Sequence, residues 1–90
     1  MEEYYLITFD STHGAIATEK VLKPIGCVIM PVPRVISASC GISVRIKPEN
    51  HEAAEAAFKE TGVYRDRQFR YYFMTNNKAT KEMTADPIEI

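Results

Sequence analysis

The chain has 90 residues, which is enough for one modest hydrophobic core and too few for two domains. Hydrophobic residues make up 46% and charged residues 26%, as in an ordinary globular protein. The net charge of −1 gives no long-range attraction to nucleic acid, and no apolar run approaches the roughly 20 residues of a membrane-spanning helix. We therefore predict neither a nucleic-acid partner nor a membrane partner.

The start of the chain and its cysteines predict the cellular compartment. Met1-Glu2-Glu3 is acidic and leads directly into a predicted strand, which is unlike a signal peptide. Two cysteines, Cys27 and Cys40, are too few for a disulfide framework. We expect free thiols and a cytoplasmic location.

The first part of the chain predicts a strand followed by a helix. Residues 4–9 are rich in β-branched and aromatic side chains and indicate a strand. Residues 10–12, Asp-Ser-Thr, supply helix-capping oxygens, so a helix is predicted over residues 12–23. Pro24 cannot continue this helix.

The next two strands are separated by a loop of small and polar residues. Residues 27–30 are apolar and run into Pro31, and because proline cannot donate to a ladder we expect this strand at a sheet edge. The loop covers residues 33–41. Residues 42–47 alternate strictly, which predicts a strand with one buried face.

A second helix is predicted over residues 51–61, with Asn50 as its cap and a stop at Gly62. Residues 63–74 are rich in aromatic side chains and predict the last strand. The remaining residues, 75–90, are polar and are expected to form a tail.

The order βαββαβ predicts an α+β fold of the ferredoxin-like kind, with a four-stranded antiparallel sheet and two helices on one face, formed by residues 1–74. In this topology the first and third strands are central and the second and fourth are edges. The turn after the first strand and the 33–41 loop then meet at one end of the sheet. Cys40 is therefore expected near the N-terminus of the first helix.

Cys40 is the best candidate for a reactive group. Its neighbours Ser39 and Gly41 are small, so we expect an exposed thiol. Nearby cations and helix N-termini favour the nucleophilic thiolate, and hydroxyl and backbone N–H groups can hydrogen-bond a thiolate or persulfide. The alternative is that Cys40 simply fills a tight turn. The candidate site comprises Cys40 with Arg34, Ser37, Ser39, Gly41 and His13.

The remaining thiol and imidazoles have weaker claims. Cys27 is predicted to be a buried small hydrophobe, with redox pairing to Cys40 as the alternative. His13 is either an acid–base partner of Cys40 or solvated, and His51 is expected at the surface. Because no paired spacing such as C-x-x-C is present, we predict no metal and no cofactor.

Arginines lie among aromatic residues in the last predicted strand, a pattern that also occurs in single-strand nucleic-acid binding. The RNP pattern is absent and the charge is balanced, so we expect a solvated face or a homodimer contact instead. The residues are Arg65, Arg67, Phe69, Arg70, Tyr71 and Tyr72.

The turn Phe9-Asp10-Ser11-Thr12 and the loop Pro33-Arg34-Val35-Ile36-Ser37-Ala38-Ser39-Cys40-Gly41 resemble the selenium/sulfur carrier protein-like family, a small bacterial domain. The resemblance implies that Cys40 bears a persulfide or selenopersulfide for transfer between donor and acceptor proteins. It further implies that Arg34, Ser37, Ser39 and Gly41 shape the loop. No second residue of comparable strength supports independent catalysis, so a carrier is predicted rather than an enzyme. The alternative is a non-enzymatic ligand-binding or regulatory module that uses the 33–41 loop.

Overall fold

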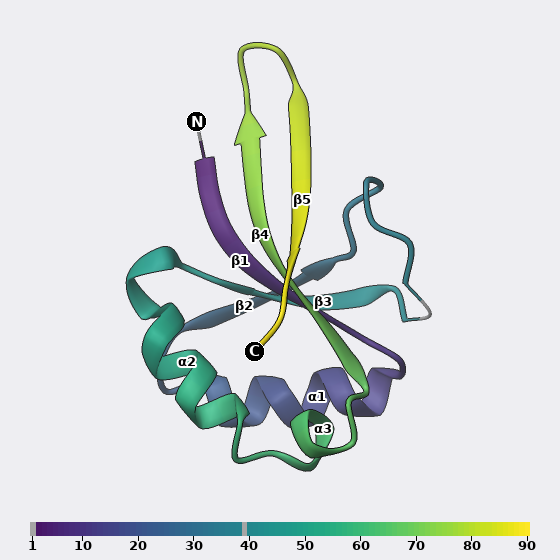
Figure 1. The fold of residues 1–90 in the computed structure, drawn as a ribbon, viewed down its shortest axis with the longest axis vertical. Helices are drawn as coiled ribbons and strands as arrows, with labels where there is room; N and C mark the ends of the chain where they lie inside the picture. The colour runs from purple at the N-terminus through teal and green to yellow at the C-terminus, as the bar shows by residue number, and fades with distance from the viewer. Residues whose placement is uncertain (1, 39) are drawn as a thin grey trace.

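The computed structural model describes residues 2–38 and 40–90. Their helices and strands follow one another as shown in Figure 1. None of the helices in this part of the chain is long and apolar enough to cross a membrane. The elements are β1 (Glu2–Phe9), α1 (Thr12–Leu22), β2 (Cys27–Pro31), β3 (Ile42–Ile46), the 3-10 helix η1 (Pro48–Asn50), α2 (His51–Phe58), α3 (Gly62–Arg65), β4 (Phe69–Asn77) and β5 (Glu82–Ile88).

One antiparallel sheet contains five strands in the order β2-β3-β1-β4-β5. The α+β class, the interior position of β1 and β3 and the edge position of β2 are therefore confirmed. The predicted count of four strands is wrong, because β5 pairs along β4 from Asn77↔Glu82 to Tyr71↔Ile88. Strand β4 consequently has a neighbour on each side, and the predicted homodimer contact through strand four has no free edge there.

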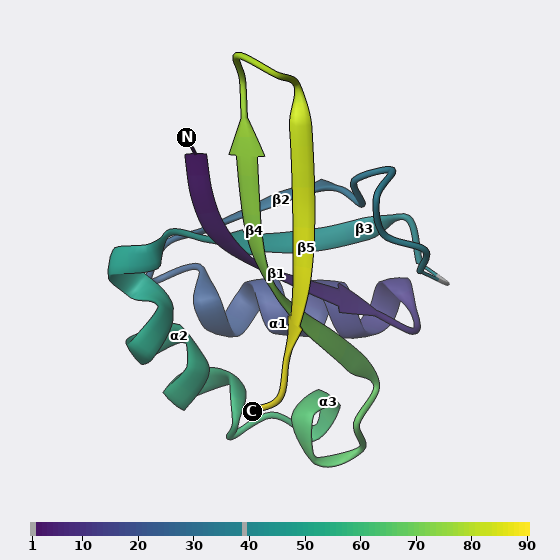
Figure 2. The same cartoon turned by 45° about the horizontal axis from the view of Figure 1, so that its top comes forward.

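The main core lies between the sheet and the helices, which all cover one face (Figure 2). Because successive strand residues point to opposite faces, Ile7 and Phe9 of β1 face the helices while Leu6 and Thr8 face away. Each fully buried large side chain contributes about 1.5–3 kcal/mol of hydrophobic free energy. The buried members are Ile7, Phe9, Ala15, Leu22, Val44, Ile46, Ala54, Phe58, Val63 and Tyr71.

Helix α1 begins immediately after β1 because Ser11 is extended (φ −146°) and its Oγ accepts a hydrogen bond from the Gly14 N–H at 3.3 Å. The helix ends before Pro24, and Gly26 makes the left-handed exit at φ +112°. These local signals fix Thr12 as the first residue of α1.

Residues 62–65 form helix α3, which corrects the prediction that the last strand begins at residue 63. Thr61 caps this helix by accepting from the Tyr64 N–H at 3.2 Å. Strand β4 therefore starts only at Phe69. Arg67 lies between α3 and β4, and its guanidinium is 5.0 Å from the centre of the Tyr64 ring and 6.0 Å from that of Phe69, the first residue of β4.

Helix α2 also differs in its limits from the prediction. It ends at Phe58, and Asn50 precedes it without a capping hydrogen bond from its side chain. The preceding residues form η1, in which Pro48 occupies the first position. A 3-10 turn at a helix start satisfies backbone groups that a side-chain cap otherwise satisfies.

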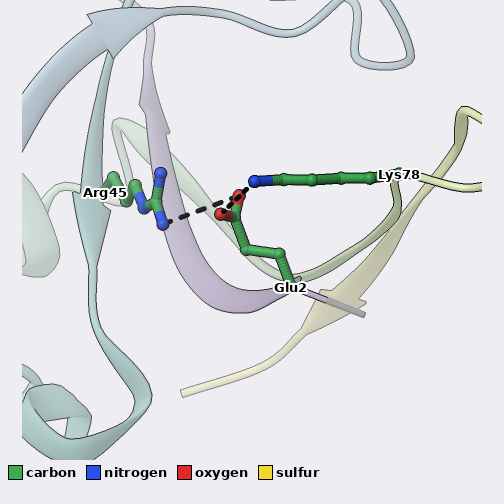
Figure 3. A network of polar contacts seen from close by, with 3 residues as sticks. All are labelled: Glu2, Arg45 and Lys78. Carbon is green, nitrogen blue, oxygen red and sulfur yellow. Dashed lines mark ion pairs between the residues drawn. The ribbon is translucent and has the colours of Figure 1, made fainter.

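The segment predicted to be a polar tail instead completes a β4–β5 hairpin. The Oδ1 of Asn77, the last residue of β4, accepts from the Ala79 N–H of the turn at 3.0 Å. Figure 3 shows the Glu2 carboxylate between two cations, with Arg45 Nη2 at 3.6 Å and Lys78 Nζ at 3.7 Å. This network joins β1, β3 and the hairpin turn.

A second, smaller core covers the sheet face opposite the helices. Tyr4, Leu6, Tyr72 and Met74 are buried there beneath Ile36 of the loop between β2 and β3. The guanidinium of Arg45, 4.4 Å from the Tyr4 ring centre, lies over part of this face. The loop is therefore packed onto the sheet, which determines the geometry of the candidate site.

Candidate functional site

The loop between β2 and β3 spans residues 32–41 and is closed at its base by a hydrogen bond from the Val32 N–H to the Gly41 carbonyl oxygen (3.1 Å). Halfway along it, the Ile36 N–H donates to the Pro33 carbonyl oxygen at 3.0 Å and forms a tight turn. This turn directs Ile36 into the second core, where only 9% of the residue is exposed. The loop is thus anchored by an apolar side chain.

The second anchor of the loop is Cys40, which is only 5% exposed. The Ile42 N–H donates to its Sγ, with a nitrogen–sulfur distance of 3.4 Å. The Thr12 Oγ1 lies 3.6 Å from the same Sγ. Because Thr12 is the first residue of α1, the predicted position of Cys40 at the start of the first helix is confirmed.

The predicted exposure of the Cys40 thiol is wrong. The sulfur is directed inward, toward Thr12 and the start of β3. The two polar contacts can stabilise negative charge on sulfur. In this arrangement the sulfur is largely inaccessible to solvent.

Thr12 is the site residue that sequence reasoning missed as an individual contact. The relevant sequence signal is the capping segment at residues 10–12, which predicts the start of the helix but not a contact with Cys40. The hydroxyl points to the loop because Ser11, not Thr12, supplies the helix cap.

The two predicted ionisable partners of the thiol, His13 and Arg34, are not among its polar contacts. Among the residues that the structure describes, the Cys40 Sγ makes its polar contacts with Thr12 and Ile42, and neither His13 nor Arg34 shares one. His13 is exposed and lines a separate groove with residues of α1, α2 and α3. Arg34 is also exposed.

Three further positions complete the predicted site. Ser37 is exposed, and Gly41 is exposed with no atom within 4 Å of the position that a Cβ would occupy. Ser39 lies outside the described residues. Two small residues of the predicted site, Ser37 and Gly41, are therefore accessible to solvent.

A polar pocket of about 290 Å³ opens beside the loop. The loop contributes Ser37 and Ala38, and β4 contributes Arg70. The end of β1 and the turn after it contribute Thr8, Phe9 and Asp10. The pocket brings a cation and a carboxylate to the same end of the sheet as Cys40.

Cys27 lies at the other end of the β2–β3 hairpin. It pairs with Ile46, whereas Cys40 precedes Ile42 at the opposite end of β3. The alternative of a redox pair with Cys40 is therefore ruled out in this fold. Burial raises the pKa of the Cys27 thiol, the charge of Glu19 raises it further and Lys23 partly opposes them, so Cys27 is a poor nucleophile.

His51 is not simply a surface residue as predicted. Its ring stacks on Tyr5 with 4.4 Å between the ring centres, and its Nδ1 lies 3.9 Å from Glu55 Oε2. His51 is the first residue of α2, and its ring packs between this helix and Tyr5 of β1 rather than against the 32–41 loop. His51 therefore contributes to packing rather than to the thiol site.

The fold and the site define a small α+β domain with a cysteine held at a helix start. A family model described as "Putative Se/S carrier protein-like" matches residues 4–68, which include most of β1, all of α1, and the loop with Cys40. The chain belongs to this family. Neither curated proteins nor solved structures gave a match.

Proposed function

We propose that the protein carries sulfur or selenium as a persulfide or selenopersulfide on Cys40. The observation that carries the proposal is the position of the Cys40 Sγ, which has the Ile42 N–H and the Thr12 hydroxyl within hydrogen-bonding distance. Membership of the carrier-like family over residues 4–68 supports the same role. Both polar groups favour a negatively charged chalcogen at this position.

The loading step follows from ordinary thiol exchange. The Cys40 thiolate attacks the outer sulfur of a persulfide on a donor protein, so a new S–S bond forms at Cys40 while the donor's S–S bond breaks. The electron pair of the broken bond leaves with the donor thiolate, which takes up the proton that Cys40 lost. The same exchange with a terminal selenium gives the selenopersulfide, and delivery to an acceptor thiol reverses the roles.

Donor and acceptor proteins reach Cys40 when the loop opens. The exposed loop residues Arg34, Ser37 and Gly41 lie where an incoming protein meets this segment, and we propose that they form its contact surface. Small side chains at two of these positions admit a partner's active site. No acid–base role for His13 is needed, because the exchange moves a chalcogen between groups of similar acidity.

Mass spectrometry of the intact protein tests the carrier role. Incubation with a cysteine desulfurase and cysteine is expected to add the mass of one sulfur atom to the wild-type chain and to the Cys27→Ser variant. Cys40→Ser is expected to gain none. An adduct on Cys40→Ser, or none on the wild type while the same donor loads a control thiol, would contradict the proposal.

The burial of Cys40 favours one alternative, a binding or regulatory module that uses the 33–41 loop without covalent chemistry. In that case Cys40→Ser leaves partner binding unchanged, since serine can keep the contacts to Thr12 and the Ile42 N–H. Affinity capture with the wild-type and Cys40→Ser chains distinguishes the two functions. Loss of exchange-dependent complexes in the variant supports the carrier.

We further assign β1 to β4 with α1 and α2 to a ferredoxin-like arrangement, to which β5 adds a strand. The support is the strand order β2-β3-β1-β4 within the sheet. We place the protein in the cytoplasm, where reducing conditions keep both cysteines as thiols. A homodimer formed by strand pairing uses the edges of β2 or β5.

A further inference from the structure

The polar pocket beside the loop contains one acidic and one basic side chain that do not neutralise each other. Asp10 and Arg70 both line it, and both are exposed. Within residues 2–38 and 40–90, neither forms an ion pair. The pocket therefore offers a carboxylate and a guanidinium to a single ligand.

The sheet register sets the spacing of these two groups. Arg70 lies directly opposite Thr8, and the Asp10 N–H donates to the Gln68 carbonyl oxygen at 3.2 Å, which continues the pairing of β1 and β4 by one step. Asp10 and Arg70 are consequently diagonal neighbours on the face away from the helices. Diagonal positions have Cβ atoms roughly 7–8 Å apart, which leaves room for a small group between the charges.

We propose that this pocket binds a free α-amino acid with a short side chain. Arg70 binds its carboxylate through two parallel N–H···O contacts of about 2.8 Å, and Asp10 accepts from its ammonium group. A simple anion is repelled by Asp10 and a simple amine by Arg70, so the pair selects a zwitterion. The volume of about 290 Å³ accommodates a small amino acid, and Ser37 adds a hydroxyl beside it.

The proposal goes beyond the carrier role and does not depend on it, because every group that contacts the ligand belongs to the pocket and none is Cys40. The Cys40→Ser variant is therefore expected to bind the amino acid as the wild type does. Loss of the carrier function and loss of this site are separable outcomes.

Titration of the full ¹⁵N-labelled chain at neutral pH tests the site by nuclear magnetic resonance. The probes are L-alanine, propionate, which lacks the ammonium group, and ethylamine, which lacks the carboxylate. L-Alanine is expected to give saturable shifts at the backbone amides of the pocket residues and to bind at least about tenfold more tightly than either analogue, since each analogue loses a charge-assisted contact. Equal binding of an analogue, the absence of saturable shifts, or shifts centred elsewhere would overturn the proposal.

Three variants assign the two charges. Arg70→Gln removes the partner of the carboxylate, so this variant is expected to bind L-alanine only as tightly as the wild type binds ethylamine. Asp10→Asn removes the partner of the ammonium group, so this variant is expected to bind L-alanine only as tightly as the wild type binds propionate. Arg65→Gln removes an exposed arginine outside the pocket and serves as the matched control. An equal loss in Arg65→Gln, or full affinity in Arg70→Gln with an unchanged thermal transition, rejects the site.

Discussion

The Cys40 Sγ and the Thr12 Oγ1 lie 3.6 Å apart although 28 positions separate them in the chain. The contact joins the middle loop of the sheet to the start of α1. It keeps the thiol inside the closed loop and positions a hydroxyl beside any atom attached to the sulfur. The first helix therefore belongs to the site as much as the loop does.

Thr12→Val is expected to shorten the lifetime of a persulfide on Cys40 by roughly two- to tenfold, which corresponds to a hydrogen bond worth about 0.5–1.5 kcal/mol. The substitution replaces the hydroxyl by a methyl group of similar size. Mass spectrometry after removal of the donor measures the decay. Thr12→Ser retains the hydroxyl and is expected to restore the wild-type lifetime, and equal decay in all three chains would show that Thr12 has no such role.

Ile36→Ala is expected to lower the free energy of unfolding by about 2 kcal/mol, because it leaves a cavity over the second core. Since Ile36 also anchors the loop, alkylation of Cys40 by iodoacetamide is expected to accelerate on the order of tenfold through local opening. The neighbouring Val35 is 51% exposed, so Val35→Ala is the matched control and is expected to change neither quantity. Unchanged alkylation in a folded Ile36→Ala chain contradicts the role of the anchor.

The sequence predicted the elements that obey strong local rules. Alternation located β3, proline placed β2 at an edge, and the capping segment before Thr12 located α1. It did not predict β5, because this strand contributes only Ile88 to the main core, while Met83 and Ala85 contact the small second core and alternate with polar residues. The available signal was the brief alternation of those two residues.

The candidate site was predicted in its location but not in its exposure. The position of Cys40 near α1 follows from the strand order, and the strand order follows from the predicted succession of helices and strands. The buried position of Cys40 includes the contact with Thr12, which lies in a segment remote in sequence. The small residues next to Cys40 in the sequence therefore do not predict whether its thiol is exposed.

Because the Tyr71 hydroxyl is buried, we expect the free energy of unfolding to fall at alkaline pH. Burial, reinforced by the negative charge of Glu55, raises the pKa of its hydroxyl above the usual 10.0. The unfolded chain therefore loses this proton first, so stability is complete below about pH 10 and falls as the pH rises toward the folded-state pKa. Urea denaturation at a series of pH values measures the slope.

Tyr71→Phe is expected to reduce that alkaline loss. Among the described residues the Tyr71 hydroxyl is buried without a hydrogen-bond partner, so its removal is also expected to be neutral or stabilising by up to about 1 kcal/mol at neutral pH. Tyr72→Phe, on the opposite sheet face, is the control and should keep the loss. An alkaline slope identical to that of the wild type in Tyr71→Phe would exclude Tyr71 as its source.

Two glycines are expected to respond oppositely to alanine. Gly26 has φ +112° and Asn50 Nδ2 lies 3.1 Å from the position of an added Cβ, so Gly26→Ala should cost at least about 1 kcal/mol. Gly41 has free space and no such backbone constraint, so Gly41→Ala should change the free energy of unfolding by less than about 0.5 kcal/mol. Thermal unfolding compares them, and similar melting temperatures for both variants would contradict this difference.

The short turn between β1 and α1 gives three consecutive residues three separate tasks. Asp10 lines the pocket, Ser11 caps the helix and Thr12 contacts the thiol. Inserting or deleting one residue here would rotate all three side chains to new directions at once. The length of this turn is therefore more strictly constrained than that of the exposed hairpin turn at residues 78–81, where Lys78, which pairs with Glu2, has a side chain that is 76% exposed.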